Sequence, residues 1–332
     1  MTRRILPLLA MFFALLVLVA CSDDTPPDDA SELAIPGAAT PIDDPFSGGY
    51  PTYDDAESGL LIVFGTPDLG VGTSRVSFAL FNDVGLISVP ELDVTTRFYP
   101  EGPEGDFETV EEAQLQFRSF PEGGRGIYTG YLTLERAGLW ALDVSVPRSN
   151  GADEAPAQVV FPVQVAEEAA APEVGEAAPV SSNRTVEDEP DLAELTTGSE
   201  PDRRLYETSI ASALEQGVPF VVTFASPAYC TNALCGPQVE VLSELADEHG
   251  EAATFIHVDL YENPTEIRGD FALARRTPVL REWNIHTDEW TFVVDADGIV
   301  TARFEGFAPR EEVEAALLEV LDESVATSRR GR

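Results

Sequence analysis

Residues Pro219–Gln238 read PFVVTFASPAYCTNALCGPQ, and this stretch decides the fold of the C-terminal part of the chain. Its β-branched and aromatic run, Phe220–Phe224, predicts a fully buried strand. Two cysteines follow, Cys230 and Cys235, and an amphipathic segment begins at Pro237. This order places sulfur at the carboxyl end of a strand and beside a helix N-terminus, where unpaired N–H groups favour a thiolate over a thiol. Two redox-capable thiols are the only chemistry that the sequence shows plainly.

The neighbouring segments predict the other elements of an α/β unit. Apolar residues at helical spacing predict helices over Tyr206–Gln216, Pro237–His249 and Pro309–Leu321. Apolar runs predict further strands over Ala253–Leu260, Thr291–Val294 and Ile299–Phe304. Asp295–Gly298, between the last two strands, is a hairpin turn signal. The resulting order, a βαβ unit followed by a hairpin and a helix, is that of the thioredoxin fold.

Four blocks carry a family resemblance: PFVVTFASPAYC, VDLYENP, VLREWNIHTDEWTFVVDADGIV and FEGFAPREEVEAALLEVL. Together they resemble a thioredoxin-like domain over residues 204–323, about one third of the chain. The resemblance implies an α/β thioredoxin-like fold and thiol–disulfide exchange by Cys230 and Cys235. It implies no cofactor, and its partner would be an exported client protein that carries thiols or a disulfide.

The spacing of the cysteines departs from the family, in which two residues separate them instead of four. In a continuous helix, five steps would part the Cα atoms of Cys230 and Cys235 by roughly 7.5 Å, beyond the limit of about 7 Å for a disulfide. We therefore expect CTNALC to be a loop. Counted from Phe224, Cys230 is the attacking thiolate and Cys235 resolves the mixed disulfide. Read from CGPQ, in which Gln238 replaces the last cysteine of CGPC, Cys235 is the nucleophile.

Two further features of the family are missing. In the family, a proline faces the cysteines from the position just before the strand that begins here at Thr291. This sequence has Glu289 and Trp290 in that place. The carboxylate on the first strand, often a proton acceptor, is replaced by Thr223. Both changes argue against rapid, general disulfide exchange.

Two alternatives stay open beside exchange. Sco-type copper chaperones are also thioredoxin-like and membrane-anchored, and they bind copper through a short-spaced cysteine pair and a histidine. Cys230, Cys235 and His286 would supply these ligands, and two thiolates with an imidazole suit copper. The other alternative is a non-catalytic binding module. His257, on a strand, and His249, at a helix end, are expected to be structural.

The N-terminus predicts export and a lipid anchor. Arg3 and Arg4 precede the apolar run Ile5–Ala20, which has the length of a signal peptide. The run ends in LVAC, which resembles a bacterial lipobox with Cys21 as the lipidated residue. Residues 1–21 are therefore predicted to be a lipoprotein signal peptide with the lipidated Cys21, which becomes the mature N-terminus. The protein is predicted to lie on the extracytoplasmic side of the cell membrane. Since Cys21 is used, the pair near residue 230 holds the remaining thiols of the three, and a staple across so short a loop would contribute little stability.

Composition excludes one class of partner. There are 59 acidic and 20 basic residues, all arginine, giving a net charge of −39. Such a surface repels nucleic acid, so we exclude nucleic-acid binding. The sequence contains no loop with acidic residues at the spacing of cation ligands, so we expect no dedicated cation site.

The rest of the chain predicts a second domain and its connections. Residues 22–54 are predicted to be a disordered tether, 167–203 an acidic Ala/Pro-rich linker and 324–332 a disordered tail. Residues 55–166 predict an all-β, immunoglobulin-like sandwich that precedes the thioredoxin-like fold. Its seven strands are expected at Leu60–Phe64, Ser74–Phe81, Leu92–Phe98, Gln114–Phe120, Ile127–Leu134, Leu139–Val146 and Gln158–Val165.

Overall fold

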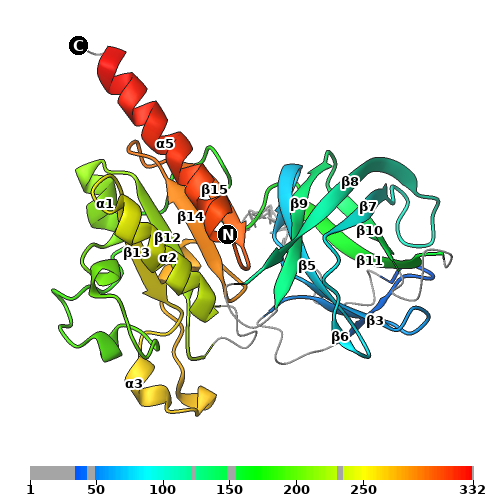
Figure 1. Cartoon of the computed structure of the whole chain (residues 1–332), viewed down its shortest axis with the longest axis horizontal. Helices are drawn as coiled ribbons and strands as arrows, with labels where there is room; N and C mark the ends of the chain where they lie inside the picture. Colours follow the sequence, from blue (N-terminus) through cyan, green and yellow to red (C-terminus); the bar gives the residue numbers. More distant parts are fainter. Residues whose placement is uncertain (1–33, 43–48, 121–124, 148–154, 230–234, 331–332) are drawn as a thin grey trace, which may run out of the picture.

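The computed structural model describes residues 34–42, 49–120, 125–147, 155–229 and 235–330. The chain forms a large, mostly antiparallel β-sheet region and a smaller mixed α/β region, which lie side by side (Figure 1). Predicted residues 1–21, with Cys21, lie outside the described part. Within that part, no helix has both the length and the apolar character needed to cross a bilayer.

The β-sheet region contains one sheet in the order β1-β2-β3-β5-β9-β8-β7-β10-β11-β4, with β6 paired to β5. All seven predicted strands are confirmed, most of them longer than expected. The bounds are β1 Thr40–Ile42, β2 Thr52–Asp55, β3 Leu60–Phe64, β4 Leu69–Gly70, β5 Gly72–Asn82, β6 Gly85–Leu86, β7 Glu91–Phe98, β8 Glu108–Ser119, β9 Gly126–Leu134, β10 Gly138–Val146 and β11 Ala157–Ala166.

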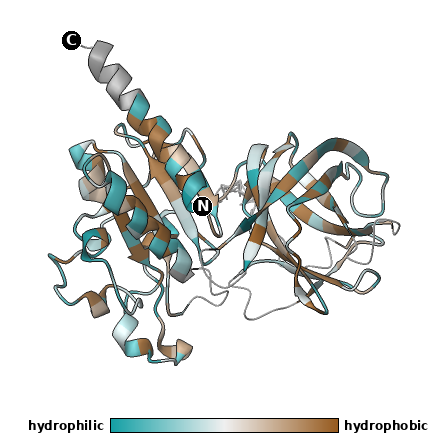
Figure 2. Ribbon diagram, in the orientation of Figure 1, coloured by the Kyte–Doolittle hydropathy of each residue, from teal (hydrophilic) through white to brown (hydrophobic). Residues whose placement is uncertain are grey.

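This sheet folds over onto itself around an aromatic core. Phe161 of β11 contacts Phe64 of β3 and Phe78 of β5, each with ring centroids 5.7 Å apart, although these strands stand far apart in the sheet order. Trp140 and Tyr128 are fully buried in the same core. Strand residues alternate between this core and solvent (Figure 2), as expected of a sheet with one wet face.

The α/β region is built on a four-stranded sheet in the order β13-β12-β14-β15, in which only β12 and β13 are parallel. Its strands are β12 Phe220–Ala225, β13 Thr254–Asp259, β14 Trp290–Val294 and β15 Val300–Glu305. Its helices are α1 Ile210–Gln216, α2 Cys235–His249, α3 Pro264–Ile267, α4 Val279–Glu282 and α5 Arg310–Arg330, with 3-10 turns η2 Leu192–Glu194, η3 Arg203–Tyr206 and η4 Phe271–Leu273. The predicted order of strands and of the three longer helices is confirmed.

Both faces of the central strands are buried, which explains their continuous apolar runs. On one face, Val221 and Val293 pack against α2 and α5. On the other, Phe220 and Phe292 pack against α1, α4 and Trp283. The body of α2 is therefore fixed over one face of the sheet.

Three connecting segments differ from the prediction where they are described. The predicted tether contains β1 and β2, because Tyr53 is buried there and its hydroxyl donates to the Pro162 carbonyl at 2.9 Å. The predicted linker packs on the α/β region, since Gly175 N donates to Val300 O at 2.8 Å. The predicted tail begins inside α5, which continues to Arg330. Single buried residues or hydrogen bonds within an acidic, Pro-rich sequence leave no periodic pattern, so composition alone wrongly predicted disorder or a free linker.

The two regions share a packed junction. Phe120, after β8, contacts Phe307, before α5, with ring centroids 4.3 Å apart in an edge-to-face arrangement. Arg303 of β15 pairs with Asp68 at 2.7 Å. Apolar and ionic contacts together fix the β-sheet region against the α/β region.

Candidate functional site

The candidate site lies at the carboxyl end of β12, as the sequence predicts. Ser226 follows the strand and is fully buried, and Tyr229 N donates to Ser226 O at 3.1 Å to form a turn. Thr197 anchors this turn, because its hydroxyl lies 3.0 Å from Ser226 Oγ and accepts from Ala228 N at 3.2 Å. The turn that leads into the cysteine segment is therefore fixed both by its own backbone hydrogen bond and by the Thr197 hydroxyl.

The second predicted cysteine, Cys235, is the first residue of α2, a helix of 15 residues. Its backbone lies where the helix dipole is most positive, which favours an anion such as a thiolate. Cys230 and the rest of CTNA lie outside the described residues, as does the predicted loop. Whether the two sulfurs form a disulfide stays a prediction.

Gln238, one turn into α2, is a buried amide. Its Oε1 accepts from Ala308 N at 2.9 Å, so it ties α2 to the segment between β15 and α5. Its Nε2 has no hydrogen-bond partner among the described residues. Gln238 therefore occupies a buried position on the sheet side of the helix.

The residue in the expected place of the proline, Glu289, is also buried. Alternate residues of a strand share a face, so Glu289 continues the row of Thr291 and Val293 on the face that α2 and α5 cover. Thr223, the other departure from the family, lies in the same row, with its hydroxyl 3.0 Å from that of Thr291. The Glu289 carboxyl thus stands just before the first residue of β14, on the sheet face that α2 and α5 cover.

Burial dominates the electrostatics of Glu289. Its carboxylate is fully buried, and neither oxygen has a hydrogen-bond partner in the described part of the chain. Burial, with a smaller contribution from Asp288, raises the pKa of Glu289 to about 8, against a lowering by Arg75. Sequence reasoning noted this residue as a substitution but not as a buried acid. Its only signal was a charged residue directly beside a continuous apolar strand.

A second buried acid, Glu305 at the end of β15, has partners. Thr287 Oγ1 donates to one carboxylate oxygen at 2.6 Å and Asp68 N to the other at 2.9 Å. Burial is again the main cause that raises its pKa to about 8, followed by the charge of Asp68. Glu305 thus joins the two regions. It is a buried acid like Glu289, but both of its oxygens accept a hydrogen bond.

A third buried acid, Asp259 at the end of β13, holds the segment that anchors the turn. It accepts from Thr197 N at 2.7 Å and from the Thr197 hydroxyl at 2.9 Å. Burial raises the pKa of Asp259 to about 6, although these hydrogen bonds lower it. Asp259 therefore positions the thiol turn through Thr197.

The histidines divide as the sequence suggests. His257 is buried with its ring 2.7 Å from the Tyr206 hydroxyl and 3.0 Å from Ala225 O, and burial lowers its pKa to about 4. It is a neutral, structural side chain. His286, the predicted copper ligand, is exposed, and its Nε2 lies 3.1 Å from Asn284 Oδ1. Since Cys230 and the Cys235 side chain are outside the described atoms, copper binding stays a prediction.

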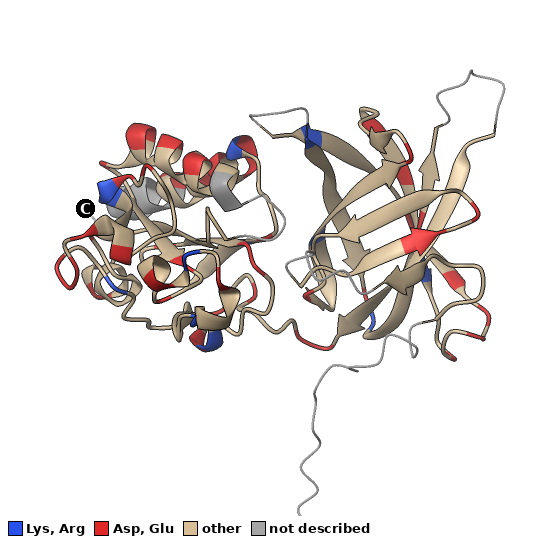
Figure 3. Ribbon diagram, turned by 90° about the horizontal axis from the view of Figure 1, so that it is seen from below, with Lys and Arg blue, Asp and Glu red and all other residues tan. Residues whose placement is uncertain are grey.

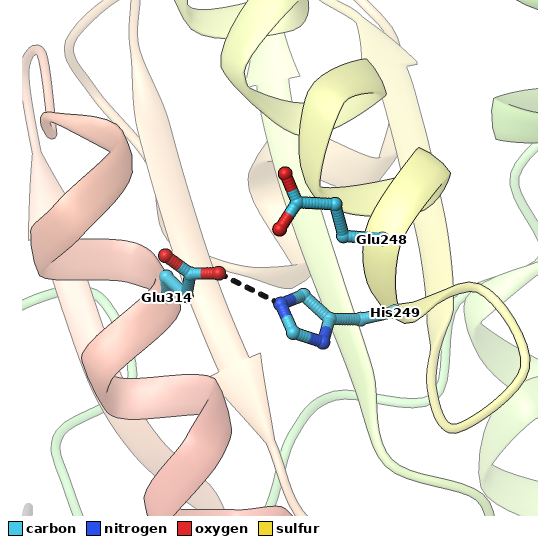
Figure 4. A group of neighbouring side chains, drawn as sticks. All are labelled: Glu248, His249 and Glu314. Atoms are coloured by element: carbon cyan, nitrogen blue, oxygen red, sulfur yellow. Dashed lines mark hydrogen bonds and ion pairs between the residues drawn. The ribbon is translucent and has the colours of Figure 1, made fainter.

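A further cluster joins the end of α2 to α5. Glu248, His249 and Glu314 place one ligand atom each within 4.8 Å of one another, and His249 Nε2 lies 2.8 Å from Glu314 (Figure 4). Arg310 already pairs with Glu314 at 3.0 Å and with Glu248 at 2.8 Å. The guanidinium supplies the cation that these carboxylates need, so the cluster is a salt-bridge network between two helices.

Three aromatic rings lie beside the thiol turn. Tyr229, Tyr261 and Phe271 form an edge-to-face cluster, with Tyr229 and Phe271 centroids 5.5 Å apart. Phe271 and Leu273 are about half exposed. The approach to the cysteine segment is therefore apolar on this side, in a chain whose surface is otherwise rich in carboxylates (Figure 3).

Two clefts run along the junction of the two regions, with volumes of about 350 and 440 Å³. Both are lined by Tyr131 of β9 and Phe304 of β15. Neither has a cysteine or histidine among the described residues that line it. Their described walls offer no thiol, so the thiol turn remains the candidate site.

No protein-family model matches the chain, and no curated protein matches it either. Two solved structures from Chlorobium tepidum are distantly similar: a putative thiol:disulfide interchange protein DsbE, and a thiol:disulfide interchange protein of the thioredoxin family. The first is 13% identical with a TM-score of 0.33, covering 45% of this chain and 99% of its own. The second is 17% identical with a TM-score of 0.32, covering 46% and 99%.

Proposed function

We propose that the protein is a membrane-anchored, extracytoplasmic thiol–disulfide oxidoreductase that acts on exported proteins through Cys230 and Cys235. The observation that carries this proposal is the place of Cys235 at the first residue of α2, the helix that follows the buried strand β12 and its anchored turn along the chain. A helix N-terminus lowers the pKa of a nearby thiol, and the thiolate is the reactive form. Lipid on Cys21 would hold the protein at the membrane.

In the proposed reaction, the Cys230 thiolate attacks one sulfur of a client disulfide. A mixed disulfide forms, and the other client sulfur leaves as a thiolate. Cys235 then attacks the Cys230 sulfur, which releases the second client thiolate and leaves Cys230 and Cys235 joined as a disulfide. The client is reduced and the pair oxidised by two electrons; an oxidised pair runs the same steps in reverse.

The β-sheet region supports the expected two-domain arrangement. Along the sheet, the seven predicted strands run first, second, fifth, fourth, third, sixth and seventh. Immunoglobulin-like sandwiches place their strands in this order, as one sheet of four and one of three. We propose an immunoglobulin-like sandwich that holds the thioredoxin-like domain in a fixed orientation.

The test is a mass and activity measurement on the full-length protein. Oxidised protein should be two mass units lighter than reduced protein, and protein primed with dithiol should reduce a test disulfide. Cys230→Ser should abolish this activity, whereas Cys235→Ser should trap a mixed disulfide. Reversed roles would favour the alignment on CGPQ. Thiols that do not react would overturn the exchange function. If the reduced protein then binds Cu(I) and His286→Ala weakens that binding, the copper-chaperone alternative is favoured; without Cu(I) binding, a non-catalytic module remains.

A further inference from the structure

Two open strand edges line the first of the two junction clefts. β15 is the outer strand of the four-stranded sheet, and its residues Thr301–Glu305 line this cleft. The same cleft is lined by Gly72–Arg75 of β5. These residues pair with β9, but the pairing of β5 with β3 begins only at Phe78, so their other side has no neighbouring strand among the described ones. The cleft therefore lies beside one unpaired edge from each region.

The alternation of hydrogen bonds along each strand shows which main-chain groups are unpaired. Gly306 N donates to Glu289 O at 2.8 Å, so the alternation turns the N–H and C=O of Arg303 away from β14. Ser77 O accepts a hydrogen bond on the β3 side of β5, so the same rule turns those of Arg75 away from β9. In the described part of the chain, these main-chain groups have no main-chain partner on that side. They are free to pair with a further strand.

Both ends of the β15 edge are already covered. Gly175 N donates to Val300 O at 2.8 Å, so the segment after the β-sheet region covers the edge up to that residue. Arg75 donates to Glu305 O at 3.3 Å and covers the other end. Thr301–Phe304 remain open between them, within the usual length of a paired strand. An open edge is a template for another chain, and here the covered ends limit it to one short segment.

The second cleft supplies side chains that select what such a segment carries. It is lined by Ala302 and Phe304 of β15, by Tyr131 of β9, and by α5, which runs along β15 (Figure 1). Tyr131 is 60% exposed. From α5, Glu311 and Glu319 line the cleft, and both are exposed. The ion pairs described for α5 include neither of them, so these carboxylates can pair with bases of a partner.

The spacing of the two carboxylates matches an extended chain. Glu311 and Glu319 are eight positions apart in α5, which corresponds to roughly 12 Å along the helix. Residues four positions apart in a strand point to the same face and lie roughly 13 Å apart. A strand that pairs with β15 can therefore present two basic side chains, four positions apart, to both glutamates at once.

We propose that the two clefts form one peptide-binding groove, which takes an extended segment of another protein with two lysine or arginine residues four positions apart. Main-chain hydrogen bonds to the β15 edge at Arg303 supply affinity, and Glu311 and Glu319 select the basic side chains. The exposed ring of Tyr131 packs against their aliphatic stems. No thiol takes part, so this binding does not depend on the exchange function.

The test uses the full-length protein and a synthetic probe, the acetylated and amidated peptide TVKVTVKVT, whose lysines are four positions apart. Calorimetry should show saturable binding at one site. Hydrogen exchange followed by mass spectrometry should slow in Thr301–Glu305 and Gly72–Arg75 when the probe binds. The same peptide with its five central amides N-methylated keeps both lysines but loses its main-chain donors, so it should not bind. A peptide with glutamate in place of lysine should not bind either.

Surface variants then locate the binding. Glu311→Gln combined with Glu319→Gln should weaken it about tenfold, the loss expected for two exposed charge pairs. The matched control, Glu240→Gln with Glu251→Gln, removes two exposed charges that do not line either cleft and should bind as wild type. Ala315→Trp, at an exposed position of the second cleft, should block the probe.

Three results would overturn the proposal, and the first two need no variant. One is the absence of probe binding to wild type, or equal binding of the N-methylated peptide. Another is slowed exchange confined to segments outside the groove. The third is an equal loss of affinity in both double variants, which would mean that only the overall negative charge of the protein attracts the probe.

Discussion

Arg75 of β5 and Glu312 of α5 form an ion pair across the junction, with Nε and Oε2 2.7 Å apart and the side chains only 4% and 19% exposed. The remaining guanidinium nitrogens of Arg75 donate to the carbonyls of Phe307 at 2.9 Å and Glu305 at 3.3 Å. Thr129 of β9 donates to the other Glu312 oxygen at 2.9 Å. One side chain from the β-sheet region thus satisfies three acceptors that surround the start of α5, the helix that covers the face bearing Glu289.

Arg75→Met should weaken the junction and destabilise the protein. Removing one partner of a buried pair takes the Arg75 donor away from Glu312 Oε2 and from two carbonyls, so we expect a loss of about 3–5 kcal/mol. Urea unfolding with fluorescence detection measures it. The control is Arg136→Met, because Arg136 pairs with Glu108 at an exposed site, 42% and 56% accessible, and should cost less than about 1 kcal/mol. Equal losses in both variants would show that the junction does not depend on Arg75.

The sequence predicted the elements that repeat a pattern. Phe220–Phe224 was found as a buried strand because apolar residues occupy both faces, and α2 was found within two residues of its start. The seven main β-strands were found because alternation and turn residues bound each one. Periodicity and turn chemistry are local properties, so they are visible without any knowledge of the fold.

Features that depend on distant contacts were not predictable. β2 is held by the contact of Tyr53 with Pro162, more than a hundred positions away. Glu289 is buried where the β-sheet region meets the start of β14: the Tyr50 hydroxyl donates to its carbonyl at 3.4 Å, and Arg75 of β5 influences its carboxyl. A glutamate before a strand normally lies at the surface, so nothing local marks this one as the buried acid of the site.

The buried acids should make the protein less stable as the pH rises. The pKa values of Glu289 and Glu305 are raised from 4.5 to about 8, and that of Asp259 from 3.8 to about 6. Between the unfolded and folded pKa values, the folded state binds more protons than the unfolded state. The stabilisation is complete below about pH 4 and is lost as the pH rises through 6 and then 8.

Urea unfolding at pH 5, 6.5 and 8 at constant ionic strength measures this effect. We expect a fall in the free energy of unfolding on the order of a few kcal/mol. Repulsion between surface carboxylates acts in the same direction, so Glu289→Gln serves as the comparison: it should be more stable than wild type at pH 8 and depend less on pH. A free energy that rises with pH in wild type would contradict the burial of these groups as acids.

Salt should stabilise the protein. Its net charge is −39, and acidic side chains are spread over both regions (Figure 3), so the compact state is opposed by self-repulsion at low ionic strength. Added salt screens charges beyond about 10 Å at 0.1 M. The melting temperature should therefore rise from low to high sodium chloride. A flat or falling dependence would show that the carboxylates are too dispersed to repel one another measurably.

Cys21→Ser tests the lipid anchor, which lies outside the described residues. If Cys21 carries lipid, the variant should appear in the soluble extracytoplasmic fraction, whereas wild type should sediment with membranes. Cys230→Ser is the matched control, because it also removes a thiol but leaves the lipobox intact. A Cys21→Ser protein that is processed normally and still sediments with membranes would rule out this mode of anchoring.

Gln238→Cys tests whether Cys235 pairs with a thiol one turn along α2 in preference to Cys230. Positions 235 and 238 lie one turn apart on the same face of α2, about 5–6 Å apart, within the reach of a disulfide. We expect the oxidised variant to join Cys235 to the new thiol and leave Cys230 open to alkylation, as peptide mapping would show. Gln238→Ser is the control for the lost hydrogen bond to Ala308 N; it should be less stable by about 1–3 kcal/mol but keep the wild-type thiol pairing. A Cys230–Cys235 disulfide that survives in Gln238→Cys would show that the CTNALC segment favours that bond over the one-turn geometry of the helix.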